Sequence, residues 1–159
     1  MRSLLAAAVL ALAAPAWAQT PQEEAGAAID AMHQAASRAD AEAYWETFTP
    51  DARFIGTAAT ERWDIPAFQA YANPIFAEGR GWTYHPRDRH LTLAPGECRC
   101  VVWFDELLDH DRYGVVRGSG VAVRTERGWR VAQYVMSFPV PNEIAGEVVE
   151  RIREAGQAH

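Results

Sequence analysis

The main change in the hydrophobic period of this chain falls at the loop Gly79-Arg80-Gly81. Before the loop, apolar residues recur three and four positions apart, as one face of a helix requires. After the loop they alternate along the chain, which is typical of β-strands. Helices followed by consecutive strands predict an α+β fold, in which helices pack on one face of an antiparallel sheet.

Capping residues predict the helices of the first half. Thr20 and Glu23 form a capping box, so a helix should run from about 21 to 38. Asp40 and Asp64 each precede a further helical pattern as candidate N-caps. A short strand over 53–55 separates these two helices, and Pro74 is expected to break or kink the last turn of the third helix. Asn142 is expected to cap a terminal helix with Ile144, Val148 and Ile152 on one stripe.

Four strands are predicted in the second half, over 82–94, 98–109, 112–125 and 128–138. Their short connections favour antiparallel neighbours. Pro86 lies inside the first of these runs, so that strand should be bulged or at an edge of the sheet. The strand over 98–109 is apolar on both faces, so both faces should be covered. One face can pack against the helices. The other face needs cover from the terminal helix or from a second subunit, and we predict a homodimer through the sheet.

The first eighteen residues have the layout of a secretion signal. A positive start is followed by the apolar run 4–14 and by Ala16-Trp17-Ala18, an A-x-A cleavage pattern. The run is shorter than the roughly 20 residues that a membrane-spanning helix needs. A buried N-terminal helix is the alternative. We expect cleavage near Ala18, a single mature domain over 19–159, and a periplasmic or secreted protein without a membrane span.

Composition limits the partners and cofactors. The net charge is −6, and all basic residues are scattered arginines, so nucleic acid is not an expected partner. The motifs of nucleotide, zinc and calcium sites are absent from the sequence, which predicts neither a metal nor another cofactor. Cys98 and Cys100 would lie about 6.6 Å apart on a strand, at the upper limit for a disulfide, so free thiols are favoured over a bridge.

Charged residues on the predicted strands are candidates for chemistry. Arg117 lies among valines, and a buried guanidinium requires a carboxylate partner. Asp105 and Glu106 are the candidates, and Asp105 is preferred. Such a pair could orient a ligand or be purely structural; if it is buried, replacing Arg117 by alanine should cost about 3 kcal/mol. His90 is a candidate acid–base group with an exposed surface histidine as the alternative.

Aromatic residues are concentrated in the helices and in the segment that follows them. Most must form the core, and others could line an apolar pocket between helices and sheet. The candidate ligand-binding residues, besides Arg117, are Tyr44, Glu61, Trp63, Trp103 and Tyr134.

The mature chain resembles the nuclear transport factor 2-like superfamily, specifically its SnoaL-like branch. The resemblance covers roughly residues 25–155 and rests on SRADAEAYWETFTPDARFIGTAATERW, FQAYANPIFAEGRGWTYHPRDRH, WFDELLDHDRYGVVRGSG and GWRVAQYVMSFPVPNE. It implies a cone-shaped roll in which a strongly curved antiparallel sheet wraps round a helix and encloses an apolar pocket. Dimers are common in this family, which includes isomerases, dehydratases and polyketide cyclases.

Members similar to ketosteroid isomerase carry an aspartate and a tyrosine at positions that correspond here to Gly56 and Met32. Both catalytic groups are therefore missing. The resemblance then favours a module that binds a small, largely hydrophobic molecule. The alternative is an isomerase, dehydratase or cyclase acting on a small apolar carbonyl or alcohol compound, with Asp105 or His90 as the acid–base group and Arg117 or Tyr134 orienting the substrate.

Overall fold

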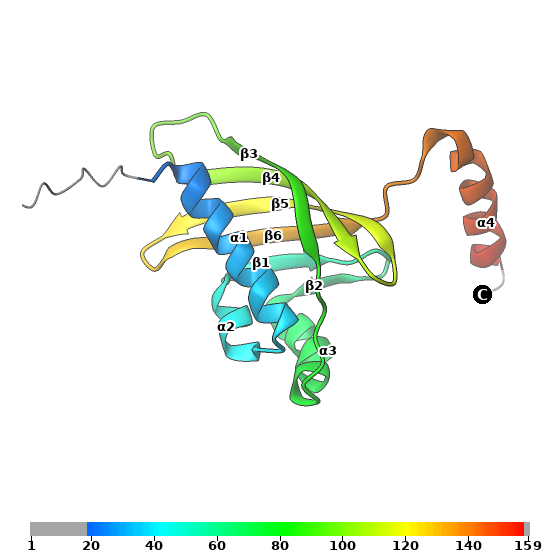
Figure 1. Ribbon diagram of the computed structural model, residues 1–159, viewed down its shortest axis with the longest axis horizontal. Helices are drawn as coiled ribbons and strands as arrows, with labels where there is room; N and C mark the ends of the chain where they lie inside the picture. The colour runs from blue at the N-terminus through cyan, green and yellow to red at the C-terminus, as the bar shows by residue number, and fades with distance from the viewer. Residues whose placement is uncertain (1–18, 158–159) are drawn as a thin grey trace, which may run out of the picture.

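The computed structural model describes residues 19–157. Six strands form one curved sheet, and the three N-terminal helices lie on its concave side (Figure 1). The α+β class and the curved-sheet architecture are therefore confirmed. The proposed secretion signal and its cleavage site fall outside the described residues.

The N-terminal helices begin where their capping residues predict. Thr20 and Glu23 form the capping box of α1 (Pro21–Ser37). The side chain of Asp40 caps α2 (Ala41–Glu46) through the backbone N–H of Ala43, and Asp64 caps α3 (Ile65–Ala77). Of the break or kink expected at Pro74, the break is wrong, because α3 continues through this residue to Ala77.

The strands are β1 (Phe48–Ile55), β2 (Arg62–Asp64), β3 (His85–Leu93), β4 (Val101–His110), β5 (Gly114–Thr125) and β6 (Gly128–Ser137). Their order in the sheet is β2-β1-β6-β5-β4-β3. The pairings are antiparallel except for β1 with β6, which is parallel. The sheet is therefore mixed. After β1 and β2 the chain crosses through α3 to the opposite edge of the sheet, where β3 lies. Sequence reasoning missed β2 and the first half of β1.

Strand β3 is an edge strand and carries a bulge, as Pro86 indicated. Arg87 pairs with Leu107 and His90 with Asp105, so two residues of β3 lie opposite Glu106 alone. One of these two, Asp88, adopts a φ of 45°. The bulge changes which side chains of β3 face the helices.

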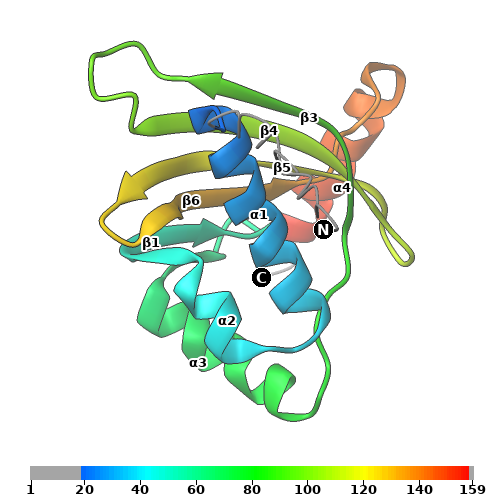
Figure 2. The same cartoon turned by 60° about the vertical axis from the view of Figure 1, so that its left-hand side comes forward.

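The core lies between α1 and the concave face of the sheet (Figure 2). Helix α1 contributes Ile29 and Met32, and the sheet contributes Phe54, Phe104 and Tyr134. The sheet face turned toward α1 is therefore the one that carries the even-numbered residues of β4, from Val102 to Leu108.

Two glycines of β5 allow large side chains on neighbouring strands to approach. A Cβ on Gly118 would collide with the hydroxyl of Tyr134, and a Cβ on Gly120 would collide with the carbonyl oxygen of Gln133 and approach Phe104 to 2.9 Å. The face of β5 that carries these glycines is thus turned toward the core, and aromatic side chains from β4 and β6 fill the space beside it.

The C-terminal segment leaves the sheet and stands apart from it (Figure 1). A 3₁₀ turn (Asn142–Ile144) precedes α4 (Ala145–Gln157). The expected cap at Asn142 is wrong, since the turn has no side-chain cap. Helix α4 covers neither face of the sheet, and Ile144, Val149 and Ile152 are exposed. None of the helices described between residues 19 and 157 is long and apolar enough to cross a membrane.

Cys98 and Cys100 form a disulfide, so the favoured reading of two free thiols is wrong. The reason is that β4 begins at Val101 rather than at 98, which leaves both cysteines in the loop between β3 and β4. Their Cα atoms are 5.1 Å apart, closer than the strand spacing assumed from the sequence.

Candidate functional site

The interior contains one fully buried carboxylate, Glu106 on β4. Its Oε1 accepts hydrogen bonds from His33 Nε2 at 2.7 Å and from the Tyr134 hydroxyl at 2.9 Å. Its Oε2 accepts from Arg89 Nε at 2.7 Å. Because a carboxylate can only accept, His33 must carry its proton on Nε2. Three donors from three elements therefore satisfy this charge.

Arg89 reaches Glu106 because of the bulge in β3. The same guanidinium donates through Nη1 to Asp30 Oδ1 at 2.6 Å and to the carbonyl oxygen of Gly26 at 3.3 Å, both on α1. The cluster thereby joins α1, β3, β4 and β6. A buried carboxylate that is paired and hydrogen-bonded in this way stabilises the arrangement of the elements around it.

The charges of the cluster determine how its members titrate. Burial by itself would raise the pKa of the Glu106 carboxyl, but the hydrogen bond and charge of His33, and then the charge of Arg89, outweigh it and the pKa is lowered. Burial and the charge of Glu106 raise the pKa of Tyr134 well above its ordinary value. Glu106 is thus ionised and Tyr134 neutral near neutral pH, which suits a fixed structural network better than proton exchange with a ligand.

A cavity of about 470 Å³ is lined by residues of β1, α3 and the hairpin between β4 and β5. Its lining is mainly aromatic, and three of the molecule's exposed large apolar side chains, Tyr71, Tyr113 and Phe138, surround it. The lining residues are Phe54, Gly56, Thr57, Glu61, Trp63, Phe68, Tyr71, Trp82, Tyr84, His110, Arg112, Tyr113, Val116, Met136 and Phe138. A concave, mostly apolar site with a few polar groups is typical of small-molecule binding.

The cavity does not reach the Glu106 cluster. His33 and Tyr134 line a separate inner space of only about 10 Å³, together with Tyr44. Phe54, Trp82, Tyr84 and Met136 line both spaces. Of the predicted ligand-binding residues, Tyr44 and Tyr134 line the inner space and not the cavity.

The polar end of the cavity lies on the hairpin between β4 and β5. His110 Nδ1 accepts hydrogen bonds from the backbone N–H groups of Arg112 and Tyr113 at 3.1 and 3.3 Å. Its Nε2 is therefore the protonated nitrogen of the neutral ring. The ring stacks on Tyr113, with 4.8 Å between centroids, and lies 4.9 Å from the ring of Tyr84. The hairpin thus gives the cavity hydrogen-bond donors beside aromatic surface.

Glu61 and Trp63 are the two predicted site residues that line the cavity. A Cβ on Gly56 would collide with the carboxylate of Glu61, so this carboxylate occupies the space that a side chain at position 56 would need. Glu61 Oε2 accepts a hydrogen bond from the backbone N–H of Ala58 at 3.0 Å. It is a half-buried carboxylate at the cavity wall.

Four predicted site residues lie on the outer, convex face of the sheet. Arg117, Asp105 and His90 are exposed, and Trp103 is 46% exposed. The buried pair of Arg117 with Asp105 is wrong: Arg117 pairs in register with Leu107, and Asp105 pairs with His90 and Ser119. Arg117, Asp105 and Trp103 were misplaced because of an incorrect choice between the two apolar faces of β4, whereas exposed His90 agrees with the alternative of a surface histidine.

Sequence reasoning missed the Glu106 cluster but considered its parts. Glu106 was the alternative to Asp105 as the partner of Arg117, and His33 follows Met32 within the predicted first helix. The available signal was the glycine parity of β5, because Gly118 lies opposite Glu106 and Gly120 opposite Phe104. Small residues facing large ones mark the packed face of a strand pair. Nothing in the sequence indicates that Arg89 belongs to the cluster, since the direction of its side chain depends on the bulge in β3.

A second groove, of about 630 Å³, lies beside α2 and the hairpin between β5 and β6. Most of its lining is polar, including Glu46, Gln69, Arg127 and Arg130. In residues 19–157 the side chains of His, Cys, Asp and Glu form no cluster that could hold a metal ion. The aromatic cavity is therefore the candidate functional site.

Comparison with known proteins identifies the fold. The chain superposes on a protein of the nuclear transport factor 2-like class from Pseudomonas putida, whose function is unknown, with a TM-score of 0.62 and 15% identity over 77% of this chain and 89% of the other. A candidate aromatic ring hydroxylase from Novosphingobium aromaticivorans gives a TM-score of 0.63 and 20% identity over 76% and 90%. A candidate dehydratase of the same class from Streptomyces avermitilis gives 0.63 and 15% over 76% and 97%.

These likenesses establish the fold and leave the reaction open, since a fold hosts many functions. A search of curated proteins found no match. The model of the SnoaL-like domain matches residues 26–141, which include all three N-terminal helices but for the first turn of α1, and all six strands. The chain therefore belongs to the SnoaL-like domain family of the nuclear transport factor 2-like superfamily.

Proposed function

We propose that this protein binds a small, largely hydrophobic molecule in the aromatic cavity at the open end of the curved sheet. The observation that carries the proposal is the combination of an open aromatic cavity with a polar cluster outside its lining, in which three donors satisfy the Glu106 carboxylate. An enzyme of acid–base type would instead direct an unsatisfied titratable group of that cluster into the cavity. Here Glu106 has its three donors and does not line the cavity.

The shape and chemistry of the cavity suggest a flat or aromatic ligand with one polar end. Trp63, Phe68 and Tyr71 are nearly parallel, with interplanar angles of 9° between Trp63 and Phe68 and 17° between Trp63 and Tyr71. Such parallel rings favour offset stacking with a planar molecule. Arg112 and His110 could donate hydrogen bonds to an oxygen at the rim.

We also propose that the protein acts outside the cytoplasm and as a homodimer. Export is supported by the secretion-signal pattern of the first eighteen residues. Dimerisation is supported by the outer face of the sheet, where exposed Trp103 lies among the half-buried side chains of Leu107, Val115 and Val121 and no helix of the described chain covers them. Exposed apolar surface of this kind is typical of a protein–protein contact.

Native mass spectrometry of the protein expressed with its first eighteen residues tests the binding and export proposals in one spectrum. We expect a polypeptide that begins at Gln19, and additional mass that remains until mild activation removes it. A polypeptide that begins at Met1 would contradict export. Persistent absence of added mass, even after incubation with cell extract, would contradict tight binding of a natural ligand.

A second candidate function is acid–base catalysis by Glu61, favoured by the position of its carboxylate at the cavity wall. The carboxylate could take a proton from the carbon next to a carbonyl group of a bound ketone. Proton–deuterium exchange of 2-tetralone in D₂O, followed by NMR, tests this. Exchange that exceeds the buffer rate and disappears in Glu61→Gln would favour the enzyme. Exchange at the buffer rate would leave the binding function as the better account.

A further inference from the structure

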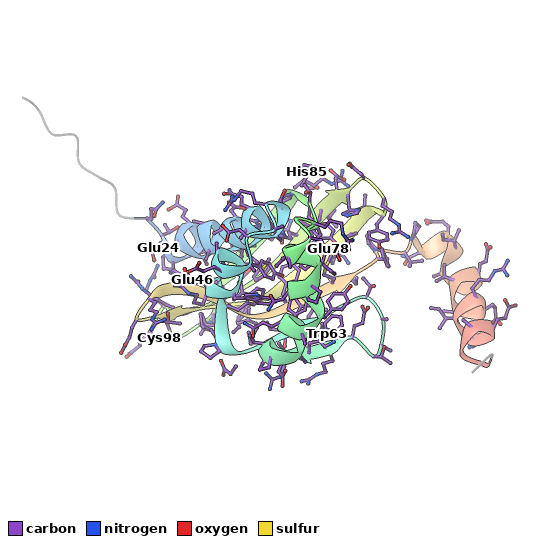
Figure 3. All side chains as sticks on the ribbon, turned by 90° about the horizontal axis from the view of Figure 1, so that it is seen from below. Glu24, Glu46, Trp63, Glu78, His85 and Cys98 are labelled. Atoms are coloured by element: carbon purple, nitrogen blue, oxygen red, sulfur yellow. A yellow bond between two sulfur atoms is a disulfide. The ribbon has the colours of Figure 1, made fainter. Side chains whose placement is uncertain are left out.

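The loop between β3 and β4 carries a disulfide that the aromatic cavity does not use. Cys98 and Cys100 are joined in this loop, and Figure 3 places Cys98 at the end of the sheet away from Trp63 of the cavity. Cys98 is exposed and Cys100 is half-buried. We infer that this disulfide is exchange-active: it oxidises accessible thiols and is itself reduced to a dithiol within the folded protein.

The first argument is access. A thiolate must approach one sulfur of a disulfide directly, and structural disulfides are protected when they lie in a core. Cys98 and its neighbours Glu97 and Arg99 are all exposed, in a loop that no helix covers. Attack at Cys98 is therefore open to a small thiol or to a cysteine of another polypeptide.

The second argument is that the fold does not need the bridge. The disulfide closes a loop with a single residue between the two cysteines, and the loop-closure entropy that a disulfide removes from the unfolded chain is small for so short a span. Backbone hydrogen bonds also hold the end of the loop between β3 and β4. Ala94 N–H donates to the Val101 carbonyl oxygen at 2.9 Å, and Arg124 N–H of β5 donates to the Cys100 carbonyl oxygen at 2.8 Å. Both redox forms should therefore be folded.

The third argument is backbone strain. Arg99, the residue between the two cysteines, has a φ of 47°, which is the left-handed region that residues with a Cβ rarely adopt. Opening the bridge frees Arg99 to return to an ordinary conformation. Strained, exposed disulfides are the more oxidising and more labile ones.

The exchange proceeds in two balanced steps. A thiolate attacks Cys98 Sγ, an S–S bond forms between them, and the bond to Cys100 breaks with its electron pair on Cys100 Sγ. A second thiolate then attacks the external sulfur of this mixed disulfide, and Cys98 leaves as a thiolate. Two external thiols become one disulfide, and the two protons that they lose are available to the protein's new thiolates.

Glutathione is the probe for the test. The protein is equilibrated in buffers of graded reduced and oxidised glutathione, quenched by alkylation and weighed by mass spectrometry. We expect a reversible transition between bridged and doubly alkylated protein within the range of these buffers, with unchanged circular dichroism. A bridge that survives excess reduced glutathione, or that unfolds the protein when it opens, would overturn the inference. So would protein that carries free thiols as isolated from an oxidising medium.

Two pairs of variants test the mechanism. Arg99→Gly relieves the strain and Arg99→Ala keeps it, while both remove the charge. Relative to Arg99→Ala, Arg99→Gly should need a glutathione ratio about fivefold more reducing for half-reduction; equal midpoints would refute the role of strain. Cys100→Ser retains Cys98 and should form a mixed disulfide with oxidised glutathione faster than Cys98→Ser does. The reverse order would contradict attack at Cys98.

Discussion

His33 on α1 and Glu106 on β4 meet across the core, 73 positions apart in the chain, with 2.7 Å between Nε2 and Oε1. This contact places the first helix over the sheet at one point, and Arg89 fixes it at a second point through Asp30 and Glu106. The register of α1 on the sheet therefore depends on one carboxylate that has no access to solvent.

Replacement of Glu106 by alanine should lower the free energy of unfolding by about 3–5 kcal/mol, because Arg89 and His33 would be left in the interior without their acceptor. Urea unfolding followed by circular dichroism measures the loss. Arg117→Ala is the matched control on the outer face and should cost less than about 0.5 kcal/mol, since Arg117 is exposed. The reverse order of the two losses would contradict the assignment of the faces of the sheet.

Acid should weaken the fold through Glu106. Its pKa is lowered in the folded protein, so the stability that it contributes is complete above its ordinary value of 4.5 and is lost as the pH falls through the lower folded value. Stability measured by urea unfolding should therefore decline below about pH 4.5 in the wild type. Glu106→Gln should be less stable at neutral pH and should decline less. Parallel declines in the two proteins would contradict this role.

Addition of a single methyl group at Gly120 should destabilise the sheet. A Cβ there would collide with the backbone carbonyl oxygen of Gln133, which cannot move without disturbing the pairing of β5 with β6. Overpacking of this kind typically costs about 1–3 kcal/mol. Gly146→Ala on α4 meets no atom within 4 Å and is the control. Thermal unfolding of the two variants makes the comparison, and a Gly120→Ala protein as stable as the wild type would contradict it.

The sequence predicted the helices well because their signals are local. Thr20, Asp40 and Asp64 each cap the helix that follows within three residues, so no distant contact was needed. The sheet was harder. Strand β4 is apolar on both faces, so alternation could not decide whether Asp105 or Glu106 points inward. Tertiary packing decided it, through the glycines of β5 and the bulge that turns Arg89 toward α1.

The cavity could be predicted only in part. Glu61 and Trp63 line it, and both stand in the segment that the aromatic-rich region of the sequence indicated. Its polar end lies on the hairpin between β4 and β5, where no site residue was predicted from the sequence. Neither the length of this hairpin nor its composition shows that it turns toward the cavity, because that direction depends on the curvature of the whole sheet.

The outer face of the sheet should mediate the proposed dimer. Trp103→Arg places a charge in the apolar part of this face and should shift the protein from dimer to monomer in light scattering at micromolar concentration. Ile152→Arg on α4 is the control and should leave the dimer intact. A wild-type monomer would contradict the proposal, and loss of the dimer in Ile152→Arg alone would assign the contact to α4 instead.

Titration with 1-anilinonaphthalene-8-sulfonate, an aromatic anion that fluoresces in apolar surroundings, tests most directly whether the aromatic cavity binds ligands. Thr57 is exposed at the cavity wall, whereas Thr60 is exposed in the same loop outside the lining. The account predicts saturable binding of one dye per chain, lost in Thr57→Trp and retained in Thr60→Trp. Binding that does not saturate, or that both variants retain equally, would contradict it.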